Sequence, residues 1–253
     1  MKIEFNFKDK IALVTGASRG IGAAIAKSLA DHGAHVILAS RKIDALREVE
    51  NSITSGGGKA SSIACHTGEL KQIESLFAEI KKNHGRLDLL VNNAATNPFF
   101  GEVLKVDEAA WEKTMSVNLK GYFFVAQKAA QMMKDQGGGS IVNVASINGI
   151  RPAPFQGIYS ISKAGVIAMT LSFAKELAAH NVRVNALLPG LTDTKFSSVM
   201  TQNESILNMI LPSIPMKRIA KPEEMVGAVL YLLSEYASYT TGTAIIVDGG
   251  MIT

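Results

Sequence analysis

The sequence contains one cysteine, so it cannot form a disulfide within the chain. An unbridged chain is typical of proteins that fold in a reducing compartment. Cys65 follows Ile63 and Ala64, and we therefore expect a small buried side chain there rather than a reactive thiol.

Long apolar segments are also lacking, and we identify no stretch that approaches the roughly 18 residues of a membrane span. Residues 1–10 alternate charged and apolar positions and lack the apolar centre of a signal peptide. Residues 250–253 carry no recognisable targeting signal. These features predict a cytoplasmic protein with no membrane partner.

Charge of one sign is not concentrated anywhere along the chain. The formal net charge is +4, and basic residues are interleaved with acidic ones, as at Lys71 and Glu74. Nucleic-acid binding favours a basic stripe with interleaved aromatic residues, and we find none. We expect no nucleic-acid partner, while a small anionic ligand such as a dinucleotide remains compatible with this composition.

What the sequence does contain is an alternation of short apolar runs with longer helical patterns. A chain of 253 residues with 47% hydrophobic and 19% charged residues is well suited to a folded core. Continuous apolar runs are typical of strands covered on both faces. The expected strands are 10–15, 35–39, 61–65, 87–92, 140–145, 182–187 and 244–247. The expected helices are 21–32, 44–54, 69–83, 107–135, 156–180 and 222–234.

This alternation predicts an α/β fold, with a doubly wound parallel sheet of about seven strands and helices on both faces. We find no linker or repeat, and therefore expect a single Rossmann-type domain over 1–253. Residues 190–221 are irregular, long for a loop, and rich in Met, Ile, Leu and Ser. Segments of that kind are often lids, so we expect 190–221 to cover a substrate.

A glycine-rich segment, Thr-Gly-Ala-Ser-Arg-Gly-Ile-Gly at 15–22, joins the first expected strand to the first helix. Gly16 permits a tight turn, and Gly20 and Gly22 permit close approach of the backbone. The start of a helix offers free N–H groups and a positive dipole end to a phosphate. The spacing departs from the usual G-x-G-x-x-G, and a purely structural turn is the alternative. Its position predicts a dinucleotide site formed by Gly16, Ser18, Arg19, Gly20, Ile21 and Gly22.

The end of the second expected strand predicts the type of dinucleotide. An acidic residue there favours NAD, and a basic residue favours the 2′-phosphate of NADP. Ser40 and Arg41 occupy this position, Arg19 is close enough in the glycine loop to flank them, and no acid occurs before Asp44. We predict NADP(H) as the cofactor; the alternative is that Arg41 merely begins a solvated helix.

Tyr159 and Lys163 are four residues apart at the start of a helical pattern, and therefore share one helix face. A free tyrosine has a pKa of about 10, which a nearby ammonium lowers towards the working range of an acid–base catalyst. Ser146 ends the fifth expected strand, at the carboxyl edge where open α/β sheets bind ligands. Asn118 lies in the helical pattern before it. A lone Tyr/Lys pair is commonly a surface pair, but together with the glycine loop, Ser146 and Asn118 it predicts a catalytic site.

With these residues in place, the chain closely resembles the short-chain dehydrogenase/reductase family over nearly its whole length. The resemblance covers the loop 15–22, the segment 92–95, Asn118, Ser146, Tyr159, Lys163, and the segments 189–190 and 248–250. It implies that Tyr159 is the general acid in reduction and the base in oxidation. It implies that Lys163 lowers the pKa of Tyr159 and holds the nicotinamide ribose, that Ser146 binds the substrate oxygen, and that Asn118 supports a water relay.

The resemblance also implies cofactor contacts outside the catalytic group. Asn92 and the backbone beside it, including Ala94, are expected at the nicotinamide ribose, and Pro189, Gly190 and Thr192 at the carboxamide. Many relatives carry an aspartate after the third strand, where this chain has His66. We expect His66 near the adenine; the alternative is a helix-entry residue without a cofactor role. The resemblance further implies a homotetramer formed through 107–135, 156–180 and the C-terminal strand, and small residues such as Ala126 and Ala174 would suit the helix contacts.

On the substrate side, the segment 97–101 resembles a subgroup of NADP-dependent carbonyl and retinal reductases. Apolar residues are available to line a pocket under the lid: Phe99, Ile147, Phe155, Met200, Ile206, Leu207, Met209 and Ile210. We therefore expect a small apolar ketone, aldehyde or secondary alcohol as substrate. One alternative is a 3-oxoacyl-thioester reductase, with Arg151, Lys217 and Arg218 as a basic entrance for an acyl carrier. A non-catalytic NADPH-binding protein is the other, which the intact catalytic group disfavours.

Overall fold

Seven parallel strands form one sheet in the computed structural model, which describes residues 4–253; the expectation for residues 1–3 lies outside the described residues. The strand order is β3-β2-β1-β4-β5-β6-β7. The strands are β1 Ile11–Thr15, β2 His35–Ser40, β3 Lys59–Ala64, β4 Leu89–Asn92, β5 Gly139–Val144, β6 Val182–Pro189 and β7 Ala244–Val247. The predicted α/β fold is confirmed.

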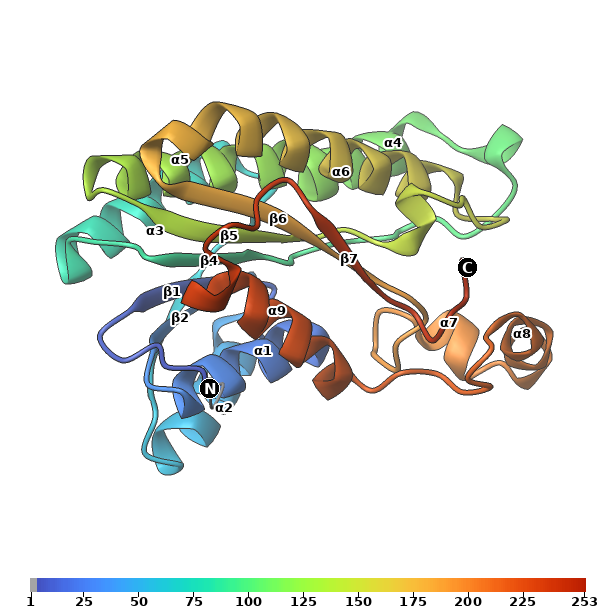
Figure 1. Ribbon diagram of the computed structural model, residues 1–253. Coiled ribbons are helices and arrows are strands. Elements are labelled where there is room, and N and C mark those ends of the chain that lie inside the picture. Colours follow the sequence, from blue (N-terminus) through green and yellow to red (C-terminus); the bar gives the residue numbers. More distant parts are fainter. Residues whose placement is uncertain (1–3) are drawn as a thin grey trace.

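Helices cover both faces of the sheet (Figure 1). The main helices are α1 Gly20–Asp31, α2 Ile43–Ser55, α3 Leu70–His84, α4 Glu108–Met115, α5 Tyr122–Asp135, α6 Gly157–Leu177 and α9 Val226–Leu233. Successive residues of β1 serve opposite faces: Leu13 packs with α3, α5 and α6, whereas Val14 packs with α1, α2 and α9. A central strand must therefore be apolar at every position, which explains its continuous hydrophobic pattern.

The helix expected over 107–135 is present as an unbroken helical run from Glu108 to Asp135, but it is not α-helical throughout. It consists of α4, a π-helical segment η2 at Ser116–Gly121, and α5. A Cβ at position 121 would collide with Thr67 O, so glycine allows the chain to pass close to the loop after β3. Single π-turns inside α-helices frequently occur at functional sites. Asn118 lies within this segment.

Other boundaries differ by a few residues from the sequence expectations. The helix expected at 222–234 comprises a 3₁₀ turn, Pro222–Met225, and α9. The third strand starts at Lys59 and ends before Cys65. Further 3₁₀ turns lie at Val103–Lys105, Ile147–Gly149, Ala178–His180, Leu211–Ser213 and Glu235–Ala237.

The segment 190–221 projects beyond the carboxyl ends of the strands and contains α7 Ser198–Thr201 and α8 Glu204–Ile210 (Figure 1). Its two ends are joined, because Asp193 N donates to Ala220 O at 2.8 Å and Ala220 N donates to Leu191 O at 3.0 Å. The chain therefore leaves the sheet and returns at nearly the same place, so that the two ends of the segment lie side by side.

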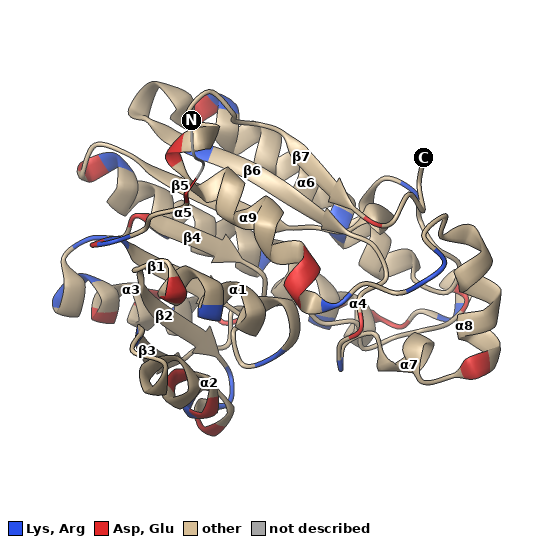
Figure 2. Ribbon diagram, turned by 60° about the horizontal axis from the view of Figure 1, so that its bottom comes forward, with Lys and Arg blue, Asp and Glu red and all other residues tan. Residues whose placement is uncertain are grey.

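One helix, Gly157–His180, is long and apolar enough to cross a membrane by length and composition, with a mean hydropathy of 1.2. The expectation of no such stretch was wrong for this segment. Half of the apolar window is buried, and Val166 and Met169 pack in the core against the sheet. The composition is therefore explained by the burial of α6 within this fold. Basic and acidic positions are interspersed along the ribbon in Figure 2.

Candidate active site

A cavity of about 860 Å³ opens at the carboxyl ends of the strands. The loops after six of the strands and the segment 190–221 contribute to its wall. Parallel sheets bind ligands at this edge, and the cavity is within the usual size range of small-molecule sites, about 300–1,000 Å³.

The glycine loop forms one end of the cavity. Gly16 and Gly20 have φ angles of +67° and +56°, which favour glycine, and Gly16 N donates to Ala39 O at 2.7 Å. A Cβ at Gly22 would lie 2.5 Å from Gly16 O, so this glycine is required for close packing of loop and helix. Arg19 precedes α1 without a side-chain cap, and the first turn contains no acid. The loop therefore offers unsatisfied N–H groups to an anion.

The charge of the cavity wall is of one sign. Among the described residues that line it there is no Asp or Glu, while six are basic: Arg19, Arg41, Lys42, Lys113, Lys163 and Lys195. Ser40 Oγ is buried and has no hydrogen-bond partner. A bound phosphate could satisfy this hydroxyl, and Arg19 and Arg41 line the same cavity, so these residues fit a phosphorylated dinucleotide.

His66 lies on the cavity wall directly after β3. Its Nδ1 accepts a hydrogen bond from Gly68 N at 3.0 Å, and its Nε2 lies 3.1 Å from Lys113 Nζ. Burial lowers the pKa of His66, and the positive charges of Lys113 and Arg41 lower it further. Sequence reasoning missed Lys113, which is carried to this wall by α4.

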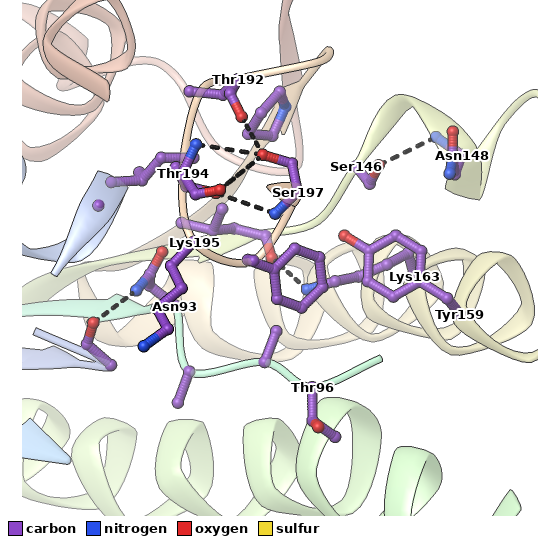
Figure 3. A pocket seen from close by; sticks show the side chains of 18 of the residues that line it. Asn93, Thr96, Ser146, Asn148, Tyr159, Lys163, Thr192, Thr194, Lys195 and Ser197 are labelled. Atoms are coloured by element: carbon purple, nitrogen blue, oxygen red, sulfur yellow. Dashed lines mark hydrogen bonds between the residues drawn. The ribbon is translucent and has the colours of Figure 1, made fainter. Parts of the chain in front are cut away.

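Ser146, Tyr159 and Lys163 lie together on another wall of the cavity (Figure 3). Ser146 follows β5, and its hydroxyl accepts a hydrogen bond from Asn148 N at 3.1 Å. Tyr159 and Lys163 lie in the first two turns of α6 and are 8% and 1% exposed. These three predicted catalytic residues are therefore within one shared site in which their side chains are buried.

Burial dominates the acid–base properties of this group. It raises the pKa of Tyr159 to about 12, and only the Ser146 hydroxyl acts to lower it. The expected lowering of this pKa by Lys163 is therefore not found in this arrangement. It lowers the pKa of Lys163 to about 7, because removing an ammonium from water disfavours its charged form. Both forms of Lys163 are thus populated close to neutral pH.

Asn118 lies behind this wall and does not line the cavity. Its amide forms two 2.8 Å hydrogen bonds with the backbone of Thr96 and a third, at 3.2 Å, with Ser162 Oγ. The side chain thereby connects the loop after β4 to α6. No direct hydrogen bond between Asn118 and Lys163 is present in residues 4–253.

The structure also keeps Asn92 out of the cavity. Its side chain is 1% exposed, and Nδ2 donates to Tyr122 O at 2.8 Å and to Asn143 Oδ1 at 3.3 Å. The expected contact of this side chain with a ribose is therefore replaced by a structural contact with α5. The following residues do line the cavity, among them Asn93, Ala94 and Thr96, as do Pro189, Gly190 and Thr192.

The far end of the cavity is mostly apolar. Of the expected lining residues, Ile147, Phe155, Met200, Ile206, Met209 and Ile210 are present in the wall. Phe99 lies at a smaller neighbouring pocket, and Leu207 lines neither. The sequence interpretation missed Phe196, whose ring centroid is 5.6 Å from that of Tyr159. The apolar end is therefore adjacent to the catalytic group.

The residues considered as a basic entrance for an acyl carrier do not line the cavity. Arg218 forms a two-pronged ion pair with Glu224, at 2.7 Å for each hydrogen bond, and Lys217 Nζ donates to Pro212 O. Arg151 is exposed on the turn after Ile147–Gly149. The structure does not bring the three together at the mouth of this cavity.

Comparison with known proteins agrees with the fold and identifies the family. A family model described as enoyl-(acyl carrier protein) reductase matches residues 16–252. The chain is 40% identical over 242 residues to mouse dehydrogenase/reductase SDR family member 4, covering 96% of this chain and 87% of the relative. It is 34% identical to tropinone reductase-like 3 of Erythroxylum coca, covering 96% of this chain and 93% of the relative.

Comparison with solved structures points to the same family. A short-chain dehydrogenase/reductase from Mycobacterium marinum superimposes with a TM-score of 0.93 at 36% identity, covering 98% of this chain and 97% of the other. A gluconate 5-dehydrogenase from Burkholderia cenocepacia, solved with NADP and tartrate, superimposes with a TM-score of 0.94 at 27% identity, covering 98% of this chain and 96% of the other. The chain belongs to the short-chain dehydrogenase/reductase family, and it is an oxidoreductase.

Proposed function

We propose that this protein is an NADP(H)-dependent reductase of apolar ketones or aldehydes. The observation that carries the proposal is the shape of one cavity with two unlike ends. One end has a glycine loop, basic side chains and an unpaired Ser40 hydroxyl. The other is apolar and adjoins Ser146, Tyr159 and Lys163.

The chain's own residues must decide between NADP and NAD, because solved relatives include both an NADP-bound gluconate 5-dehydrogenase and an NAD⁺-bound xylitol dehydrogenase. A 2′-phosphate adds negative charge at the end of β2. Arg41 and Arg19 supply positive charge at this end, and Ser40 supplies a hydroxyl without another partner. Charge-assisted hydrogen bonds of this kind favour the phosphorylated dinucleotide.

Each side chain of the catalytic wall has a separate role in carbonyl reduction. NADPH, when bound, is the hydride donor. Tyr159 Oη transfers its proton to the carbonyl oxygen, and the Ser146 hydroxyl hydrogen-bonds to that oxygen as negative charge develops. The Lys163 ammonium stabilises the phenolate left on Tyr159. In alcohol oxidation the same groups act in reverse, and Tyr159 accepts the proton.

The substrate preference is tested by following NADPH oxidation with an apolar diketone and an acetoacetyl thioester in parallel. We expect the diketone to be preferred, because Phe196, Met200 and Ile210 line the reacting end while Arg218 is paired with Glu224 away from it. Preference for the thioester would instead favour the 3-oxoacyl-thioester reductase, which is consistent with the acyl-carrier name of the matching family model. Binding of NADPH without turnover of either substrate would favour the non-catalytic alternative.

We also propose a homotetramer formed through the outer faces of α5 and α6. Ala126 and Ala174 are buried inside the single chain, so the expected contact through these small residues is wrong. Larger apolar side chains are exposed on the same helices, including Phe123 at 40% and Leu171 at 47%. Such exposed apolar groups on neighbouring helices are typical of an interface.

Light scattering of the purified protein tests this assembly, with four chains per particle as the expected result. Leu171→Glu places a charge on the proposed interface and is expected to give a smaller particle. Leu104→Glu is the matched control for an added charge, because Leu104 is 94% exposed and lies on the turn Val103–Lys105, outside both helices. A monomeric wild type would contradict the proposal. We place the protein in the cytoplasm, which cell fractionation would test.

A further inference from the structure

We propose that Tyr122, a buried side chain on α5, is a positioning residue that holds the Lys163 ammonium at the catalytic wall. The inference rests on the proposed function, because it assigns Tyr122 a role in the reaction of Tyr159 and Lys163. Tyr122 does not line the cavity, so its effect on the reaction passes through Lys163.

Three polar groups form a closed triangle behind the catalytic wall. Lys163 Nζ donates to Val144 O at 2.7 Å and to Tyr122 Oη at 3.2 Å. The Tyr122 hydroxyl donates its own proton to Val144 O at 3.0 Å. Lys163 Nζ also lies 4.6 Å from the ring centroid of Tyr122 and 5.8 Å from that of Tyr159. The ammonium is therefore held near two tyrosine rings by neutral oxygen atoms.

Neutral partners matter here because the ammonium has no carboxylate nearby. Lys163 forms no ion pair within residues 4–253, and no Asp or Glu of that range lines the cavity. Two titratable groups face the Lys163 ammonium: Tyr159 on α6 and Tyr122 on α5. The strand β5 contributes only the carbonyl of Val144. The segment 190–221 contributes Lys195, a like charge, to the cavity wall. Loss of one neutral acceptor therefore removes a large share of what stabilises the charged form.

The local fold fixes the position of Tyr122. The π-helical segment η2 ends immediately before it, and Asn92 Nδ2 donates to Tyr122 O at 2.8 Å. Burial raises the pKa of the Tyr122 phenol well above its usual range, so the hydroxyl stays protonated at any working pH. Tyr122 thus acts as a fixed dipole beside Lys163 and not as a proton donor to the substrate.

Tyr122→Phe keeps the ring and removes the hydroxyl, so it tests this role directly. Without the hydroxyl, we expect the pKa of Lys163 to fall by about one unit, the scale of one hydrogen bond to a charged group. Turnover needs the ammonium, which is lost as the pH rises through that pKa. The alkaline limb of the kcat profile for NADPH oxidation should therefore move about one unit to lower pH, while KM for the carbonyl changes less than about twofold.

Tyr231→Phe is the matched control, because its hydroxyl contacts Thr240 Oγ1 at 3.1 Å away from the cavity. This variant should keep the wild-type pH profile. Folding of each variant is checked by thermal unfolding, and Tyr122→Met, which also removes the hydroxyl, is used if the phenylalanine variant does not fold. An unmoved alkaline limb in a folded Tyr122 variant would overturn the proposal.

A second readout separates this inference from the proposed function. NADPH binding, followed by fluorescence titration between pH 5 and 9, needs no carbonyl substrate. The contact between Lys163 and the nicotinamide ribose that the family resemblance implies would make this binding sensitive to the ammonium. We expect the midpoint of its pH dependence to fall in the Tyr122 variant and to stay unchanged in Tyr231→Phe. A wild type that binds NADPH but reduces neither test carbonyl would refute the proposed function, and this titration would still decide the role of Tyr122. Identical binding profiles in all three proteins would refute that role.

Discussion

Replacing Tyr159 with phenylalanine is expected to lower kcat for carbonyl reduction by about 100- to 10,000-fold, the usual contribution of a positioned general acid. Affinity for NADPH should change less than about threefold. The substitution removes one oxygen atom from a side chain that is 8% exposed and keeps the ring that packs near Phe196. The loss is therefore chemical rather than structural, and stopped-flow single-turnover measurements would locate it in the reduction step.

The matched control for this prediction is Tyr239→Phe. Tyr239 is fully exposed and makes no contact with the cavity, so its variant should retain wild-type kcat. Retained turnover in Tyr159→Phe would show that another group protonates the carbonyl oxygen. Loss of NADPH binding together with turnover would show that Tyr159 supports the cofactor site and would leave its acid role without support.

The sheet and its edge were predictable from sequence because both follow from local patterns. The five inner strands are largely buried on both faces, the edge strands β3 and β7 are partly exposed, and all seven end at the same side of the sheet. Knowing the strands, one also knows that the loops after β1, β2 and β5 meet. The glycine loop, Ser40 and Ser146 could therefore be assigned to one site from the chain order alone.

The errors arise where a side chain's direction depends on tertiary packing. Asn92 ends a buried strand, and sequence cannot tell whether its amide faces the cavity or α5. The π-turn that contains Asn118 leaves the helical pattern of 107–135 almost unchanged, yet it shifts the residues that follow. Tyr122 was not identified from the sequence. Its contact with Lys163 joins positions 41 residues apart, which no local pattern reports.

At the cofactor end of the cavity, the sequence likewise did not show which residues from distant parts of the chain meet. Sequence reasoning identified Arg41 from its place after β2, but not Lys113, which lies on a helix far along the chain and meets His66 in space. The absence of acidic residues from the described cavity wall is also a tertiary property, since the chain as a whole has 22 acidic residues. The local field is therefore much more positive than the net charge of +4 suggests.

That field leads to the second prediction, which concerns Arg41→Ala. NADPH affinity is expected to fall about 10- to 100-fold, as for loss of a charge-assisted hydrogen bond to phosphate, while NADH affinity changes less than about twofold. Fluorescence titration of each dinucleotide gives both values. Raising the ionic strength should reduce the ratio of NADPH affinity to NADH affinity in the wild type, because screening weakens interactions between exposed charges.

Arg47→Ala is the control that separates a local contact from a general loss of positive charge. Arg47 belongs to the same helix region, its side chain is 66% exposed, and it does not line the cavity. Its removal subtracts the same charge from the protein and should leave the NADPH preference intact. If the wild type binds NADH as tightly as NADPH, or if Arg41→Ala and Arg47→Ala behave alike, Arg41 does not recognise a 2′-phosphate. The unpaired Ser40 hydroxyl would then no longer support a phosphate site, since the buried Ser62 hydroxyl lacks a partner as well and does not line the cavity.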